Sequence, residues 1–131
     1  MNHEKLIELG LGYPGASVKT PFDPDMQVLY VKDKMFALFG RHAEWESVNL
    51  KTDPEEAWLQ RESYPDAVLP GYHMNKRHWN TVVLNGKVPG DTVRQMLQES
   101  YQLVVAKLPK RVRAELAGSM KRDMPGGGRE S

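Results

Sequence analysis

The most chemically varied stretch of the sequence runs from Gly71 to Trp79. Its nine residues, Gly-Tyr-His-Met-Asn-Lys-Arg-His-Trp, contain two cations, two imidazoles, one amide and two aromatic rings. Strand-like sequence lies on both sides, so residues 75–78 are expected to form an exposed connection. A basic turn of this kind can clamp a phosphate backbone while neighbouring aromatic side chains stack or pack alongside. The alternative is a solvated turn whose aromatic residues, Tyr72 and Trp79, belong to the core.

A second basic cluster lies near the end of the chain. Its cations are Lys107, Lys110, Arg111 and Arg113, and it is extended by Lys121 and Arg122. Cations at the C-terminus of a helix face its negative end, and this accounts for Lys107 and Lys110 without any ligand. The same argument accounts less well for the charges beyond Pro109, so contact with phosphate is the second interpretation of this cluster.

Positive charge is concentrated in the second half of the chain, although the formal net charge is only +1. Residues 1–66 contain 7 Lys or Arg and 12 Asp or Glu, whereas residues 67–131 contain 11 and 5. Such an asymmetry suggests an anionic partner for the second half. A compact fold that interleaves the two halves would instead let them attract each other.

The sequence contains no recognisable catalytic or metal-binding motif. It has no cysteine, which excludes disulfides, thiol nucleophiles and cysteine-based zinc sites. His73 and His78 are five residues apart on a predicted turn, whereas paired ligands on a helix prefer a spacing of four. Neither a nucleophile elbow nor a phosphate-binding Gly-rich loop occurs. We therefore expect no enzymatic activity, no metal and no cofactor.

The length of 131 residues suggests one domain, which we place at residues 1–118. Residues 119–131 contain three consecutive glycines and many charges, and are expected to form a flexible tail. No apolar segment approaches the ~20 residues of a membrane helix, and the N-terminus lacks the pattern of a signal peptide. These features favour a cytoplasmic protein that does not enter a membrane.

Hydrophobic periodicity and breaker residues divide the chain into alternating groups of helices and strands. Helices are predicted over residues 2–9, 53–63 and 93–108, and a basic helical turn follows to about Leu116. Strands are predicted over residues 26–31, 35–39, 46–51, 67–74 and 79–84, the fourth interrupted by Pro70-Gly71. The turns between strands are placed at Asp33-Lys34 and, after the last strand, at Asn85-Gly86.

Two of these elements have particularly clear signals. Asp53 can cap the second helix, Pro54 suits its first position, and two glutamates favour its positive end. In the third helix, apolar residues recur at spacings of three and four. They are Val93, Met96, Leu97, Tyr101, Val104 and Leu108. Ser100 lies on the same side, where a small residue allows close packing.

The predicted order of the elements along the chain is α-β-β-β-α-β-β-α. It indicates an α+β fold in which an antiparallel sheet of about five strands carries helices on one face.

Several separate segments together resemble one known family. Residues 71–82 (GYHMNKRHWNTV) look like the signature of the MmcQ/YjbR family. Residues 34–37 (KMFA), 49–51 (NLK), 100–104 (SYQLV), 108–110 (LPK), 14–16 (PGA) and 21–22 (PF) also fit it, in the same order. The resemblance spans roughly residues 5–113. It implies a CyaY-like α+β fold and a small bacterial protein of a group commonly described as DNA-binding.

The sequence and the resemblance together favour a DNA-binding protein of low sequence specificity. No recognition helix with base-reading residues is evident, so the contacts would be to phosphates, from residues 75–78 and 107–113. The predicted interface residues are Tyr72, Asn75, Lys76, Arg77, His78, Trp79, Lys107, Lys110, Arg111 and Arg113. The alternative is a non-catalytic adaptor that binds a protein or a small ligand. It would use the outer strand of the first three-stranded group, or a groove lined by Tyr72 and Trp79.

Overall fold

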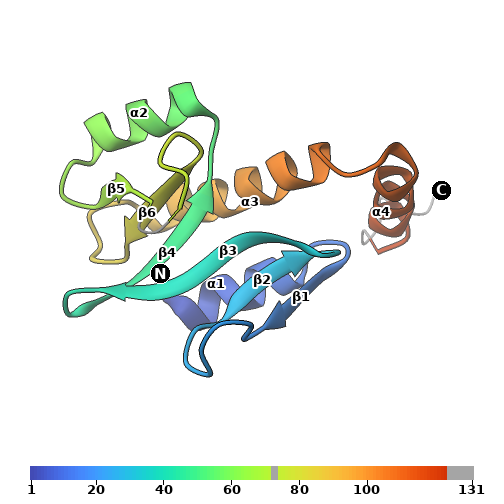
Figure 1. The fold of residues 1–131 in the computed structure, drawn as a ribbon, viewed down its shortest axis with the longest axis horizontal. Helices are drawn as coiled ribbons and strands as arrows, with labels where there is room; N and C mark the ends of the chain where they lie inside the picture. The colour runs from blue at the N-terminus through green and yellow to red at the C-terminus, as the bar shows by residue number, and fades with distance from the viewer. Residues whose placement is uncertain (72–73, 124–131) are drawn as a thin grey trace.

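The computed structural model describes residues 1–71 and 74–123, with side chains up to residue 118. In this part of the chain, four helices accompany a six-stranded sheet, which confirms the predicted α+β class (Figure 1). The helices are α1 (His3–Leu11), α2 (Pro54–Ser63), α3 (Gly90–Ala106) and α4 (Lys110–Asp123). The strands are β1 (Ala16–Lys19), β2 (Val28–Val31), β3 (Lys34–His42), β4 (Trp45–Lys51), β5 (Val68–Pro70) and β6 (Trp79–Val83).

The sheet has the strand order β1-β2-β3-β4-β6-β5, and all neighbouring strands are antiparallel. It therefore contains one strand more than the five predicted. The missed strand, β1, has only four residues and lies between Pro14-Gly15 and Thr20-Pro21, so no alternation could develop. These residues form a strand because they pair with β2, and a tertiary contact of this kind leaves no periodic pattern in so short a segment.

Helices α1 and α3 cover one face of the sheet, and α2 lies near its β5–β6 end (Figure 1). On the covered face, fully buried side chains from neighbouring strands, such as Leu29, Val48 and Val82, meet the apolar side of α3. The periodicity predicted for α3 is confirmed, because Val93, Met96, Leu97, Ser100, Tyr101 and Val104 are all buried. Alternation then places every second strand residue on the opposite face.

Ser100 does more than allow close packing of α3. Its hydroxyl group accepts a hydrogen bond of 2.8 Å from the Lys51 N–H and donates one of 2.6 Å to the Phe36 carbonyl. The side chain is completely buried, so both backbone groups would otherwise lack a partner there. Ser100 thus joins the end of β4 to the start of β3 from beneath, where the β3–β4 register has ended at Ala37–Leu50.

Tyr101, on the buried side of α3, packs against aromatic residues of the core. Tyr101 packs edge-on against Phe36, and its hydroxyl donates to the Pro14 carbonyl at 2.5 Å. Burial, and secondarily the neighbouring Tyr13, raises the pKa of Tyr101 to about 12. The Tyr101 hydroxyl group therefore keeps its proton near neutral pH and can donate this hydrogen bond.

Helix α3 ends before Pro109, as predicted, because proline disfavours helical geometry in the residue that precedes it. A separate helix, α4, then runs to Asp123, well beyond the turn predicted to end near Leu116. Leu116 is buried and lies so close to Gly15 that a Cβ atom there would be 2.6 Å from its Cδ2 atom. The backbone of residues 119–123 continues this helix, whereas the sequence predicted a flexible tail from residue 119; residues 124–131 lie outside the described part.

No helix within the described residues is long and apolar enough to cross a membrane.

Candidate nucleic-acid interface

The predicted basic turn is a tight structure closed by its own first residue. The Asn75 carbonyl accepts hydrogen bonds from the N–H groups of His78 and Trp79, at 3.1 and 3.0 Å. The Asn75 side-chain oxygen accepts a third from the Arg77 N–H at 3.0 Å. The Lys76 and Arg77 side chains are exposed, whereas His78 and Trp79 are half-buried. The predicted contact Tyr72, together with His73, lies outside the described residues.

Two residues that sequence reasoning missed hold this turn in place. The Arg61 guanidinium donates to the Lys76 carbonyl and, through Nε, to the Asn80 side-chain oxygen at 2.7 Å. The Asn80 amide nitrogen in turn donates to the Ala57 carbonyl and the Gln60 side chain on α2. Asn80 is 1% exposed, although it occupies a position expected for an ordinary strand residue. The sequence did contain one signal for this role, because Asn80 is a polar residue on the core-facing side of a strand rich in Thr and Val, and a buried polar side chain needs hydrogen-bond partners.

Lys51 connects the turn to the rest of the positive surface. It is the register partner of Trp79, and the following residue, Thr52, donates its N–H to the His78 carbonyl at 2.7 Å. Lys51 is half-buried, and this burial, followed by the nearby charges of Lys107 and Lys34, lowers its pKa below the ordinary value. Lys51 and Lys34 were not predicted as interface residues, because only the sheet pairing places them beside the two basic clusters.

The second predicted cluster divides between two helices. Lys107 is the C-cap of α3, whereas Lys110, Arg111 and Arg113 stand at the start of α4. The first turn of α4 contains no acidic residue, so its cations add to the positive end of the helix dipole. The explanation of Lys110 as a favourable C-terminal cation is therefore wrong, because Lys110 begins a new helix. All four side chains are exposed.

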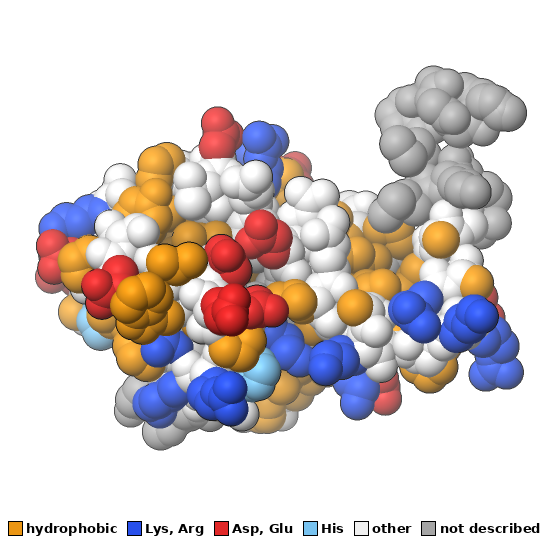
Figure 2. All heavy atoms as spheres, turned by 90° about the horizontal axis from the view of Figure 1, so that it is seen from above, with side chains coloured by type: hydrophobic (Ala, Val, Ile, Leu, Met, Phe, Trp, Pro, Cys, Tyr) orange, Lys and Arg blue, Asp and Glu red, His pale blue; other side chains and the backbone are white. Residues whose placement is uncertain are grey.

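We call these cations the basic edge. It consists of Lys34, Lys51, Lys76, Arg77, Lys107, Lys110, Arg111 and Arg113. Among the described residues, none of them forms an ion pair, whereas Lys5, Lys87 and Arg94 are each paired with a carboxylate. In Figure 2, Lys and Arg side chains form a row along the lower border of the view. Because the basic edge forms no ion pair among the described residues, its charge is available to an anion in solution.

An acidic group borders the basic edge and limits where an anion can lie. Asp53, Glu56 and Glu99 line a shallow hollow between α2 and α3, and acidic side chains gather above the middle of the row in Figure 2. Burial, with a smaller contribution from Glu56, raises the pKa of Glu99. Asp53 itself caps α2 as predicted, by accepting from the Glu55 N–H at 3.2 Å.

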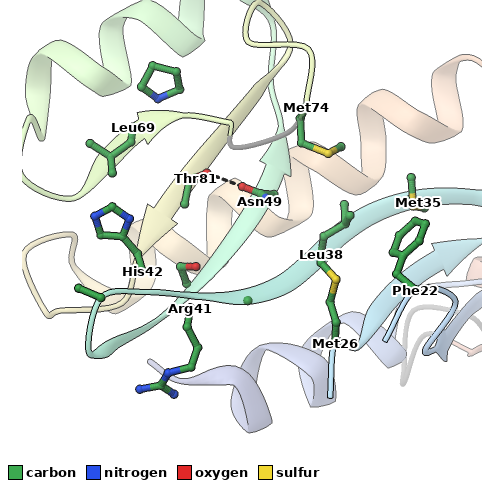
Figure 3. Close-up of a pocket in the computed structure, with 14 residues that line it drawn as sticks. Phe22, Met26, Met35, Leu38, Arg41, His42, Asn49, Leu69, Met74 and Thr81 are labelled. Carbon is green, nitrogen blue, oxygen red and sulfur yellow. Dashed lines mark hydrogen bonds between the residues drawn. The ribbon is translucent and has the colours of Figure 1, made fainter. Parts of the chain in front are cut away.

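A large groove lies on the sheet face that the helices leave open (Figure 3). It has a volume of about 890 Å³. Half of the lining residues are large and apolar: Phe22, Met26, Met35, Leu38, Leu69, Pro70 and Met74. Its floor contains Gly40, Ser47, Asn49 and Thr81. The predicted groove residue Trp79 does not line it. Sequence reasoning missed this site, because its walls come from segments far apart in the chain.

No metal centre is evident in the part of the chain that the structure describes. Within those residues, no group of three or more His, Asp or Glu side chains is arranged to hold an ion. His42 is the last residue of β3 and stands at one end of the groove (Figure 3), whereas His78 belongs to the basic turn.

The six-stranded antiparallel sheet with helices on one face and a basic edge defines a small α+β protein with a positively charged border. The YjbR family model matches residues 11–103, and the chain belongs to this family. It is 35% identical to the uncharacterized protein YbdF of Escherichia coli O157:H7 over 109 residues, 83% of this chain and 88% of that protein. It is 34% identical to the uncharacterized protein YjbR of Escherichia coli K12 over 113 residues, 86% and 95% of the two chains.

Solved structures agree with this assignment. A Deinococcus radiodurans protein with the domain DUF419 superposes with a TM-score of 0.80 at 34% identity, covering 88% of each chain. A Pseudomonas syringae protein superposes with a TM-score of 0.67 at 28% identity, covering 79% of this chain and 98% of that one. The resemblance seen in the sequence is thus confirmed at the level of family and fold.

Proposed function

We propose that this protein binds duplex DNA with low sequence specificity, through phosphate contacts made by the basic edge. The observation that carries the proposal is a row of Lys and Arg side chains along one border of the molecule (Figure 2), together with the absence of any ion pair from the eight cations of the basic edge among the described residues. Lys and Arg contacts to phosphates supply the sequence-independent part of DNA affinity. Like charges that lower the pKa of Lys51 would gain from an anion placed between them.

The arrangement supports phosphate contact better than base reading. Lys76 and Arg77 project from a turn held at both ends by hydrogen bonds, which reduces the cost of ordering them. The first turn of α4 presents backbone N–H groups together with its cations, an arrangement suited to a phosphate. In the turn, the Asn75 side-chain oxygen is already used by the Arg77 N–H, and the first turn of α4 contains no Asn or Gln, so neither element presents a free amide beside a guanidinium for reading bases in a major groove. The proposal assigns no catalytic activity to the protein.

The test is fluorescence anisotropy of a labelled duplex of ~20 base pairs at low salt. We expect binding by the wild type, and a loss of at least about tenfold in affinity for the double variant Lys76→Ala/Arg77→Ala, since each phosphate contact removed weakens electrostatic binding. The matched control is Lys87→Ala/Arg94→Ala, which removes two cations that are already paired with Asp66 and Asp91. It should bind as the wild type does. Absence of binding at low salt, or equal loss in both variants, would contradict the proposal.

The adaptor alternative needs one correction. The outer strand of the first predicted group corresponds to β2, and β1 pairs along its free side. Strand addition at that position is therefore blocked. The edges of the sheet are instead β1 and the three-residue strand β5. A short edge strand offers few backbone groups to a partner, and this favours the basic edge over strand addition.

A further inference from the structure

The open face of the sheet carries a polar stripe between two apolar walls. Ser47, Asn49 and Lys51 follow one another at every second position of β4, so they share one face. Successive members are about 7 Å apart along the strand. The wall on the β3 side contains Met35 and Leu38, joined by the loop residues Phe22 and Met26. The wall on the β5 side contains Leu69, Pro70 and Met74 (Figure 3).

Two groups in this stripe lack a hydrogen-bond partner within the described structure. Ser47 is only 5% exposed and lines the groove, yet its hydroxyl group makes no hydrogen bond there. The Asn49 oxygen accepts from the Thr81 hydroxyl, which leaves the Asn49 amide N–H groups as available donors. A buried polar group without a partner costs about 1–3 kcal/mol, so such groups in a groove point to a ligand that supplies partners.

The two ends of the polar stripe differ in whether their positive charge is available to a ligand. Beyond Asn49 lies the Lys51 ammonium, reinforced by Lys34 and Lys107. At the opposite end, the Arg41 guanidinium points away from the groove and donates to the Glu44 carbonyl at 2.6 Å (Figure 3). Arg41 and His42 both line the groove at that end, whereas Lys51 stands just beyond the lining residues, on the same face of β4 as Asn49. Because Lys51 forms no ion pair among the described residues and the Arg41 guanidinium is engaged by a carbonyl group, an anionic group would be favoured at the Lys51 end.

We propose that the groove binds an elongated amphipathic carboxylate, with its apolar body between the two walls and its carboxylate at Lys51. An oxygen atom along the body would accept a hydrogen bond from Asn49. The volume of about 890 Å³ suits a small molecule of this kind. Three methionines in the walls provide adaptable apolar surface. The walls are mainly aliphatic, with Phe22 as their one aromatic ring, which favours an alkyl body over stacked bases.

Gly40 allows the groove to be filled without disturbing the fold. Its backbone does not adopt a positive φ, and a Cβ atom there would meet only the Ser47 Oγ atom, at 3.9 Å. Gly40→Phe should therefore occupy the groove from its floor while leaving the covered face unchanged. Leu69→Glu is a second blocking variant, because it places a negative charge in the wall of a site for an anion.

The experiment is an NMR titration of the ¹⁵N-labelled protein with decanoate, decanol and decyltrimethylammonium, which share one alkyl chain and differ in head-group charge. We expect saturable shifts at the amides of Leu38, Gly40 and Asn49, with decanoate binding most tightly. Lys51→Gln should weaken decanoate binding by about tenfold or more, the lower limit expected for the loss of one hydrogen bond to a charged group. The control Lys5→Gln, a cation on α1, should have no effect.

The blocking variants and a hydroxylated probe complete the test. Gly40→Phe and Leu69→Glu should abolish the decanoate shifts, and 5-hydroxydecanoate should bind more tightly than decanoate. No saturable shift on the open face, equal affinity for the three head groups, or binding retained in both blocking variants would overturn the carboxylate site. Equal affinity of the two carboxylates would overturn the role of Asn49. Duplex binding in Gly40→Phe should equal that of the wild type, so failure of either proposal is recognised separately.

Discussion

The covered and open faces of the same sheet differ in how completely they are filled. On the covered face, Leu29, Val48 and Leu97 are fully buried, and the polar side chains Ser100 and Asn80 have all their important partners inside the protein. On the open face, the groove contains the nearly buried Ser47 hydroxyl group, which has no hydrogen-bond partner among the described residues, and Gly40, which has space above it. One side of the sheet is therefore packed for stability, whereas the other leaves a groove that the described residues do not fill.

The largest contrast should come from two leucines. Leu97→Ala removes a completely buried side chain from α3 and should lower the free energy of unfolding by about 2–5 kcal/mol. Leu69→Ala removes a half-buried side chain from the open face and should cost about 1 kcal/mol or less. Urea denaturation measures both. Similar losses for the two variants would show that the faces do not differ as described.

Ser100 tests whether the covered face depends on internal polar partners. Ser100→Ala leaves the Lys51 N–H and the Phe36 carbonyl without their hydrogen bonds, at a cost of about 2–3 kcal/mol. Ser63→Ala, at an exposed position of α2, is the control and should change stability by less than about 0.5 kcal/mol. The Lys51 amide should also exchange with solvent faster in the Ser100 variant. Unchanged exchange would mean that the hydroxyl group does not hold the two strands together.

A pair of glycines gives a smaller contrast of opposite sign. At Gly10, on the covered side, an added Cβ atom would lie 2.4 Å from the Leu29 Cδ1 atom, so Gly10→Ala should destabilise by about 1–2 kcal/mol. At Gly40, on the open face, Gly40→Ala should be neutral or stabilise by up to about 1 kcal/mol, because the unfolded chain loses freedom. Thermal unfolding of the two variants compares them. A stabilised Gly10→Ala would contradict the close packing of α1 on β2.

Lys51 stands where the open face meets the basic edge, and its titration gives the smallest effect. Because burial and the charges of Lys107 and Lys34 lower its pKa, Lys51 loses its proton before ordinary lysines do. Bound phosphate favours the protonated form, so DNA affinity should fall as the pH rises through this lowered pKa. Anisotropy at a series of pH values measures the fall, which Lys51→Gln should remove. An identical pH profile in that variant would assign the effect to another group.

The elements with strong local signals could be predicted from the sequence. The apolar spacing of α3, the Asp53-Pro54 start of α2 and the alternation of β4 each act within one turn or one strand. The first hairpin turn was placed one residue late, since Lys32 occupies it with a φ of 57° and Lys34 already belongs to β3. A lysine with positive φ gives no sequence signal comparable to glycine.

The candidate sites depended more strongly on tertiary structure. The two basic clusters were visible as charge runs, but their connection through Lys51 arises from its pairing with Trp79. The supporting contacts of Arg61 and Asn80 join residues nineteen positions apart. The groove combines the loop before β2 with the segment before β6, and no local pattern relates these segments. The sequence therefore predicted which segments are basic, whereas the arrangement of their side chains in space required the structure.

The most direct test of the basic edge is the salt dependence of duplex binding. If about four to six cations neutralise phosphates, log Kd plotted against log salt concentration should have a slope of about 4 to 5 for the wild type, because bound counterions are released. Lys51→Gln/Lys107→Gln should reduce the slope by about 2, whereas the control Lys5→Gln/Lys87→Gln should leave it unchanged. A slope near zero, or the same reduction in both variants, would contradict a phosphate-binding role for this edge.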